Sequence, residues 1–135
     1  MTTDLNIDLT GRRILVTGAG GGIGLAIAEK LSNAGAKVVV NDVSSERLKE
    51  AGEKIGAAGT LSANISDEAA VKKLMNDAVT ILGGIDGVVN NAGVADPLRS
   101  TKRQSLEDWR RVMDVNVQGC FLMCREMTSY MQPGA

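Results

Sequence analysis

A glycine-rich segment near the start of the chain has the residue types and spacing to bind phosphate. Residues 17–24 read Thr-Gly-Ala-Gly-Gly-Gly-Ile-Gly and follow the apolar run 13–17. Glycines between a strand and a helix let the backbone approach a pyrophosphate closely, and the helix N-terminus offers free N–H groups and a favourable dipole. The spacing of Gly18, Gly22 and Gly24 is not G-x-G-x-x-G, and no Gly-Lys-Ser/Thr follows, so the segment is not a P-loop. We therefore predict a dinucleotide-phosphate site here.

An acidic residue follows this segment at a separation that suits the same ligand. Asp42 stands eighteen residues after Gly24, at the end of the apolar run 37–42. A carboxylate there accepts hydrogen bonds from the adenine-ribose hydroxyls and repels a 2′-phosphate. No Arg or Lys lies between Thr17 and Glu29 to offset that repulsion. We expect NAD in preference to NADP; the alternative is an Asp that only begins a turn.

The elements that must position these groups alternate along the chain. Short apolar runs predict strands, and stretches with apolar residues at helical spacing predict helices. The expected strands are 13–17, 37–42, 60–65 and 85–90, and the expected helices are 23–34, 45–55, 67–82 and 106–131. Ser44, Ser66 and Ser105 are the expected N-caps. Four alternations without hairpin turns predict an α/β fold, a parallel sheet of right-handed βαβ units covered by helices on both faces.

Two motifs carry a resemblance to a known family. Residues 17–24, together with Asn90-Asn91-Ala92-Gly93 at the end of the fourth expected strand, resemble the N-terminal half of the short-chain dehydrogenase/reductase family. The resemblance implies a Rossmann-like doubly wound sheet, seen here as βαβαβαβα and truncated before the fifth strand. The cofactor-binding residues that it implies are Gly18, Gly20, Gly21, Gly22, Ile23, Gly24, Asp42, Val43, Asn64, Ile65, Asn91, Ala92 and Gly93. A turn that merely ends a strand is the alternative for the second motif.

The last expected helix holds a polar residue within an apolar stripe. The stripe consists of Trp109, Val112, Met113, Val117, Cys120, Phe121 and Cys124, and Asn116 falls within it. An amide on an apolar face must be hydrogen-bonded, so an Asn satisfied by nearby backbone is one reading. Residues 115–119 also resemble the family segment that bears the Asn of its Asn-Ser-Tyr-Lys set. The resemblance implies that Asn116 is catalytic and positions water in a proton relay.

The rest of that catalytic set has no counterpart in these 135 residues. The only tyrosine is Tyr130, Gly134 stands four residues later, and no lysine follows Lys102. The resemblance implies an NAD-dependent oxidoreductase that transfers hydride between NAD(H) and a secondary alcohol or ketone, and we expect the chain alone to be inactive. The other hypothesis is a non-catalytic half-Rossmann module that binds a nucleotide or serves as a partner subunit.

Composition limits the remaining classes of function. A chain of 135 residues suits one domain, 1–135, here an incomplete NAD(P)-binding Rossmann domain. A net charge of -1 gives no electrostatic support for binding nucleic acid or an anionic membrane. With no histidine and only Cys120 and Cys124 as thiols, we expect neither a metal site nor a disulfide. Residues 1–9 lack the basic start of a signal peptide, so we expect a cytoplasmic protein, and by resemblance a homo-oligomer if full length.

Overall fold

The computed structural model describes residues 6–135. Residues 1–5, which belong to the segment 1–9 used in the prediction about a signal peptide, lie outside the described residues. Four strands form one parallel sheet in the order β3-β2-β1-β4. They are β1 (Arg13–Val16), β2 (Lys37–Asp42), β3 (Gly59–Ser62) and β4 (Gly87–Val89). The sheet is parallel because a helical crossover returns the chain to the same end of the sheet after every strand. The expected α/β, Rossmann-like fold is confirmed.

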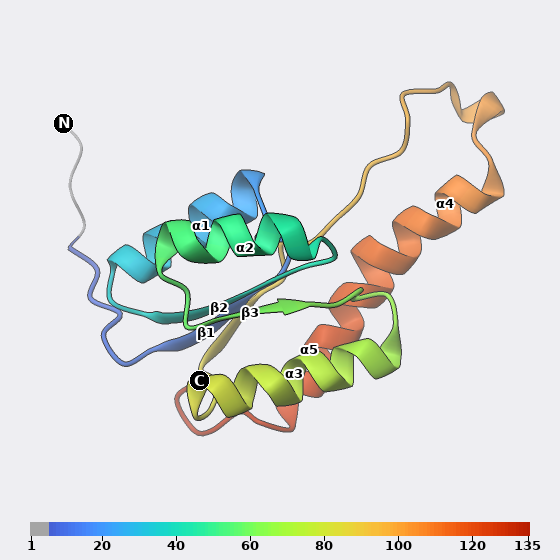
Figure 1. The fold of residues 1–135 in the computed structure, drawn as a ribbon. Helices are drawn as coiled ribbons and strands as arrows, with labels where there is room; N and C mark the ends of the chain where they lie inside the picture. The colour runs from blue at the N-terminus through green and yellow to red at the C-terminus, as the bar shows by residue number, and fades with distance from the viewer. Residues whose placement is uncertain (1–5) are drawn as a thin grey trace.

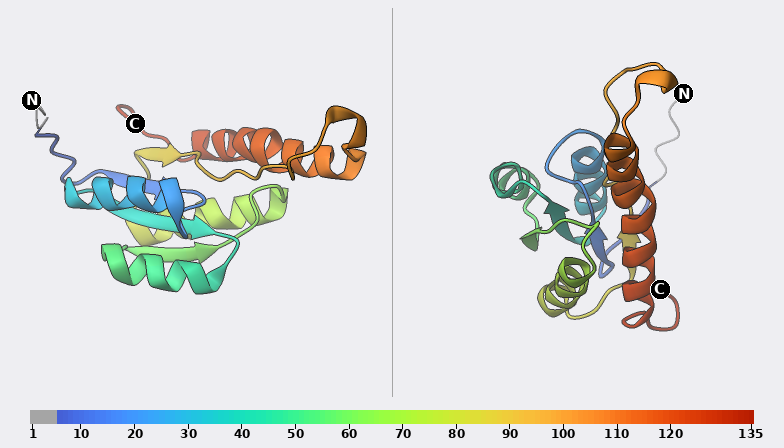
Figure 2. Two further views of the ribbon diagram at one scale, coloured as in Figure 1. Left: turned by 90° about the horizontal axis from the view of Figure 1, so that it is seen from above. Right: turned by 90° about the vertical axis from the view of Figure 1, so that its right-hand side faces the viewer.

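Helices cover both faces of this sheet (Figure 1). On one face lie α1 (Gly22–Asn33) and α2 (Ser45–Ile55), and on the other lie α3 (Glu68–Leu82) and α5 (Cys120–Thr128). A short η1 (Thr101–Arg103), α4 (Leu106–Met113) and the π-helical η2 (Asp114–Gly119) precede α5. Figure 2 shows that α4, η2 and α5 form one long rod whose α4 end projects beyond the sheet.

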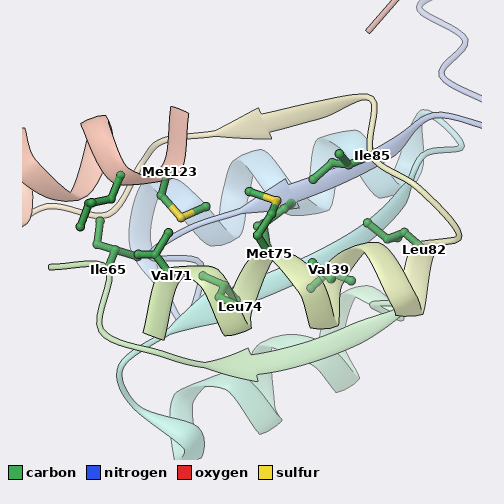
Figure 3. Packing of buried hydrophobic residues seen from close by; sticks show 11 residues of the cluster. Val39, Ile65, Val71, Leu74, Met75, Leu82, Ile85 and Met123 are labelled. Atoms are coloured by element: carbon green, nitrogen blue, oxygen red, sulfur yellow. The ribbon is translucent and has the colours of Figure 1, made fainter. Parts of the chain in front are cut away.

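The core is split between the two faces by the two-residue alternation of strand side chains. Val38 and Val40 of β2 pack with α1 and α2, whereas Val39 between them packs with α3 and α5. On the second face the buried side chains include Val71, Leu74, Met75, Leu82, Ile85 and Met123, which Figure 3 shows interdigitating below β1. Both faces of β2 are therefore buried, as its continuous apolar run predicts.

Local capping agrees with the sequence at two helices and differs at a third. Ser44 and Ser105 accept hydrogen bonds from backbone N–H groups in the first turns of α2 and α4, as expected. The expected cap Ser66 is wrong, because the side chain of Asp67 accepts from the N–H of Ala70. The amide oxygen of Asn64 accepts from both the N–H and the hydroxyl of Ser66 instead. The third strand begins and ends earlier than expected, and β4 is shorter than expected at both ends.

The long helix expected over 106–131 departs furthest from expectation. It is interrupted by the π-helical turn of η2, and α5 ends at Thr128. The expected apolar stripe does not face the core, because Trp109, Val117 and Phe121 are 50%, 53% and 58% exposed. Leu122 and Met123 are buried instead. A π turn holds one extra residue, which rotates the following helix relative to the preceding one and changes the face that meets the sheet.

The chain after α5 returns to the edge of the sheet. Met131 forms an isolated parallel bridge with Ile85, just before β4. Within residues 6–135, β4 itself pairs only with β1. The outer edge of β4 thus carries backbone groups that another parallel segment could pair with.

Candidate functional site

A cleft of about 420 Å³ opens at the carboxyl ends of the strands. Between β1 and β4 the chain order reverses, because β1 is followed by β2 on one side while β4 lies on the other. In open α/β sheets, ligands bind at such a switch point. The cleft is lined by Gly18, Gly21, Gly22, Asn41, Asp42, Val43, Arg47, Ala63, Asn64, Ile65, Asn91, Ala92, Gly93, Val94 and Val115. The structure thus brings together most of the cofactor-binding residues expected from the four segments at the ends of β1, β2, β3 and β4.

The glycine segment forms the floor of the cleft because it can lie close to its neighbours. Gly18 has a φ of +63°, and a Cβ at this position would lie 2.7 Å from the Cα of Ala92. A Cβ at Gly24 would collide with the amide of Asn91 and the carbonyl of Gly18. Gly24 therefore packs beneath the loop rather than lining the cleft. A side chain at either position would push the two loops apart.

The start of α1 presents unpaired N–H groups to the cleft. Gly21 is the N-cap residue, and no side chain caps this helix. Gly21 is in extended backbone, and a Cβ there would meet nothing within 4 Å. The uncapped N-terminus of α1 is therefore open to an anion. Ile23 in the first turn is exposed and does not line the cleft.

Thr17 and Asn91 join the glycine segment to the loop after β4. The buried hydroxyl of Thr17 donates to the carbonyl of Val89 and accepts from the N–H groups of Asn91 and Ala92, both at 3.1 Å. In return, Nδ2 of Asn91 donates to the carbonyls of Thr17 and Gly18 at 3.1 Å. These bonds fix the two loops relative to each other. Sequence reasoning did not single out Thr17 as the centre of this network.

Asp42 lies at the wall of the cleft with both carboxylate oxygens engaged. Oδ2 accepts from the N–H of Gly20 at 3.1 Å, and Oδ1 accepts from the N–H of Ser44 at 3.0 Å. Oδ1 also accepts from Nη2 of Arg47 at 2.6 Å. Burial raises the pKa of Asp42, but the bonds from Ser44, Arg47 and Gly20 outweigh it and hold the pKa below its usual value. Asp42 is therefore ionised at neutral pH, and Gly20 acts by orienting it.

Arg47 is the charged residue among the five lining residues that the sequence did not reveal; the other four are Asn41, Ala63, Val94 and Val115. The expectation that no cation offsets Asp42 considered only residues 17–29, whereas Arg47 reaches Asp42 from α2. The backbone N–H of Arg47 donates to the capping hydroxyl of Ser44, so the cap fixes the position of the Arg47 backbone. The sequence did contain a signal for this contact: Ser44, the expected helix cap, follows Asp42 by two residues, and the basic residue Arg47 follows Ser44 by three.

Val43, Asn64 and Ile65 line the cleft together with Asp42. Val43 is 65% exposed beside Asp42. Ile65 is buried, and its side chain occupies the space that a Cβ at Gly119 would need. Gly119 therefore allows the rod of α4, η2 and α5 to approach this loop closely.

Asn116 lies in η2 and does not line the cleft, but it bonds the backbone of Val94, which does. Its Oδ1 accepts from the N–H of Val94 at 2.8 Å, and its Nδ2 donates to the carbonyl of Val94 at 2.9 Å. Gly93 leaves room for this contact, since a Cβ there would lie 3.3 Å from Oδ1 of Asn116. The amide is thus satisfied by nearby backbone, as one of the two sequence readings predicted, and it positions the loop that follows Gly93.

Other candidate groups lie apart from the cleft. Tyr130 packs against the core beyond the end of α5. Cys120 and Cys124 are free thiols, and Asn90 donates to Sγ of Cys124 at 3.4 Å. In the described chain no three His, Cys, Asp or Glu residues cluster as metal ligands. No helix between residues 6 and 135 is long and apolar enough to cross a bilayer.

A glycine turn at a helix N-terminus and a cleft of about 420 Å³ at the switch point of a parallel sheet define a dinucleotide-binding α/β protein. The family model for short chain dehydrogenases matches residues 12–135. The chain therefore belongs to the short-chain dehydrogenase family, which confirms the resemblance; its relatives are oxidoreductases with an NAD(P)-binding Rossmann fold.

Individual relatives agree with this assignment. Glucose 1-dehydrogenase 2 of Bacillus subtilis is 38% identical over 132 residues, which cover 92% of this chain and 50% of the relative. A 3-ketoacyl-(acyl-carrier-protein) reductase from Brucella melitensis complexed with NADH superposes with a TM-score of 0.88 at 34% identity, covering 91% of this chain and 51% of that one. A Burkholderia cenocepacia short chain dehydrogenase in complex with NADP gives 0.85 at 31% identity, covering 91% and 52%. The chain spans about half the length of these relatives.

Proposed function

We propose that this chain is the cofactor-binding part of an NAD(H)-dependent oxidoreductase that transfers hydride between the nicotinamide and a secondary alcohol or ketone. The observation that carries the proposal is the cleft itself, where the uncapped start of α1, Asp42 and the loop 91–93 face one another. Bound NAD would supply the hydride acceptor. Gly18, Gly21 and Gly22 would hold its pyrophosphate, Asp42 and Val43 its adenine ribose, and Asn91 to Gly93 its nicotinamide ribose.

The chemistry beyond cofactor binding needs a proton donor or acceptor on the substrate oxygen. Tyr130 is not a cleft residue, and the sequence holds no Tyr-x-x-x-Lys. We therefore expect residues 1–135 alone to bind cofactor without turning over substrate. Asn116 would contribute by holding Val94, and through it the loop beside the reacting centre.

The preference for NAD rests on Asp42. Its carboxylate is ionised and lies at the cleft wall, so it would accept hydrogen bonds from ribose hydroxyls and disfavour a 2′-phosphate. We further propose a cytoplasmic location, which the two free thiols support, since reducing compartments keep thiols free. Small-molecule alcohols or ketones are the proposed substrates, and the exposed apolar side chains of α4, η2 and α5 support a homo-oligomer.

A charge introduced at Gly21 tests the cofactor site without disturbing the fold. A Cβ fits at Gly21, and aspartate or asparagine at this N-cap position would stabilise α1. We expect Gly21→Asp to melt at or above the wild-type temperature and yet to weaken NADH binding by at least about tenfold, because its carboxylate repels the pyrophosphate. Gly21→Asn is the matched neutral control, because it has the shape of aspartate without its charge, and it should bind NADH more tightly than Gly21→Asp. Titration of NADH fluorescence measures both.

Equal binding of NADH by wild type and Gly21→Asp would contradict the proposed site. The second candidate, a binding module without catalysis, is supported by one observation: the Asn116 amide bonds the backbone of Val94, so it has a structural role that needs no catalysis. The dehydrogenase proposal predicts NADH formation from an alcohol once a chain that carries Tyr-x-x-x-Lys is joined to residues 1–135. If the joined protein is saturated with cofactor and still turns over no secondary alcohol, the result would favour the hypothesis of a binding module without catalysis.

A further inference from the structure

The ion pair between Asp42 and Arg47 supplies one of the three hydrogen bonds described for the Asp42 carboxylate. Two of the three bonds to the Asp42 carboxylate come from the backbone N–H groups of Gly20 and Ser44, which the loops hold in place. The third comes from Arg47, whose side chain is 57% exposed and lines the cleft. Arg47 is therefore the one partner of Asp42 that can move when a ligand arrives.

The guanidinium changes what the carboxylate presents to a ligand. A lone Asp42 would repel a 2′-phosphate, but the pair of Asp42 and Arg47 has no net charge. Among residues 6–135 the guanidinium donates one side-chain hydrogen bond, to Asp42, of the five it can make. Its remaining donors match the oxygens of a phosphate, which arginine binds in a bidentate manner.

Arg47 also competes with ribose hydroxyls. Oδ1 of Asp42 already accepts two hydrogen bonds, from Ser44 and Arg47, so a ribose hydroxyl reaches Oδ1 only if Arg47 moves away. Removal of Arg47 would free Oδ1 for NAD and restore the full repulsion of the 2′-phosphate. Both effects change the ratio of NAD to NADP affinity in the same direction.

We propose that Arg47 is a specificity-determining residue that lowers the ratio of NAD to NADP affinity. It does so by neutralising Asp42 and by donating hydrogen bonds to the 2′-phosphate of NADP. With NAD bound, a ribose hydroxyl takes the place of Arg47 on Oδ1 of Asp42, while Oδ2, which accepts one hydrogen bond from Gly20, has room for a second. With NADP bound, Arg47 bridges Asp42 and the phosphate. The inference rests on the proposed function, because it takes the cleft to be a dinucleotide site.

Two small probes isolate this effect. Adenosine 5′-monophosphate and adenosine 2′,5′-bisphosphate differ only in the 2′-phosphate, and calorimetry measures the affinity of each for residues 1–135. We expect Arg47→Ala to weaken the bisphosphate by about tenfold, as for loss of a charge-assisted hydrogen bond, and to leave the monophosphate unchanged or tighter. Lys49→Ala is the matched control, since it removes an exposed cation from the same helix outside the cleft wall and should change neither affinity.

Asp42→Asn provides an independent readout. It should reverse the preference toward the bisphosphate while Arg47 is present, and the double variant with Arg47→Ala should lose that gain. If the monophosphate binds but Arg47→Ala leaves the bisphosphate unchanged, or weakens both probes equally, the inference is overturned and the proposed function stands. If neither probe nor NADH binds the wild-type chain, both fall.

Discussion

At the scale of single residues, Thr17 holds the cleft together although it touches no expected ligand atom. Its hydroxyl is fully buried and serves three backbone groups, the carbonyl of Val89 and the N–H groups of Asn91 and Ala92. A buried N–H that loses its partner costs more than the hydrogen bond contributes, because the group cannot return to water. The loop after β4 is therefore held by this hydroxyl together with the side-chain amide of Asn91. The N–H of Asn91 also donates to the carbonyl of Val89 at 3.0 Å, so the N–H of Ala92 is the group that depends most on Thr17.

Replacement of Thr17 by valine keeps the side-chain shape and removes this hydroxyl. We expect Thr17→Val to lower the free energy of unfolding by about 1–3 kcal/mol, the usual range for buried groups left unpaired. NADH affinity should fall as well, because the loop 91–93 loses its anchor. Urea denaturation and NADH titration measure the two effects. Thr80→Val, on the exposed side of α3, is the control, and an equal loss in both variants would refute the role given to Thr17.

At the scale of elements, two contacts between neighbouring segments set the positions of the cleft walls. The π-helical turn η2 presents Asn116 to Val94 from one side and Gln118 to the carbonyl of Ser66 from the other. At the amino ends of the strands, the guanidinium of Arg13 in β1 donates to both carboxylate oxygens of Asp86, just before β4, at 2.9 Å. The first contact positions loops of the cleft, and the second positions the strands that carry them.

Loss of the Asn116 amide should loosen one loop and leave the others in place. In Asn116→Ala the N–H and carbonyl of Val94 lose their partners, so we expect faster amide hydrogen exchange in residues 94–100. Gln118→Ala is the control, because it removes an amide of the same turn that bonds a different loop, and it should affect residues around Ser66 instead. Unchanged exchange at residues 94–100 in Asn116→Ala would show that the loop is held by other contacts.

The contact between β1 and β4 predicts a pH dependence of stability. The hydrogen bonds from Arg13 lower the pKa of Asp86 from 3.8 to about 2. A carboxyl whose pKa is lower in the folded than in the unfolded chain stabilises the fold above about pH 4, and this contribution is lost as the pH falls toward 2. We expect Asp86→Asn to be less stable than the wild type at pH 7 and the difference to shrink between pH 4 and pH 2. Urea titrations at several pH values measure it, and a difference independent of pH would refute the assignment.

At the scale of the whole molecule, one apolar surface has no cover within the described chain. Trp109, Val117 and Phe121 are each half exposed or more and lie on the rod formed by α4, η2 and α5. Large exposed apolar side chains that lie together, as Val117 and Phe121 do, can mark a protein interface. The rod is also anchored to the fold through its other side, where Leu122 and Met123 enter the core.

We expect this surface to mediate self-association of the chain. Val117→Lys places a charge at its centre, beside Asp114 on the same turn, and should shift the protein toward monomer in sedimentation velocity at micromolar concentration. Leu98→Lys, at a fully exposed position of the preceding loop, is the control and should leave the oligomeric state unchanged. A wild-type chain that sediments as a monomer would remove the basis for the proposed homo-oligomer.

The order of strands and helices along the chain, the family, and the four segments that meet at the cleft could all be predicted from the sequence. These features depend on local signals: apolar periodicity, glycines after a strand, and a capping serine before α2. The tertiary structure alone decided that Arg47 reaches Asp42, that Thr17 anchors the loop after β4, and that Asn116 bonds Val94. It also decided which face of α5 is buried. Such contacts depend on the register between elements far apart in the sequence, and an extra residue in one turn changes that register without altering the apolar pattern.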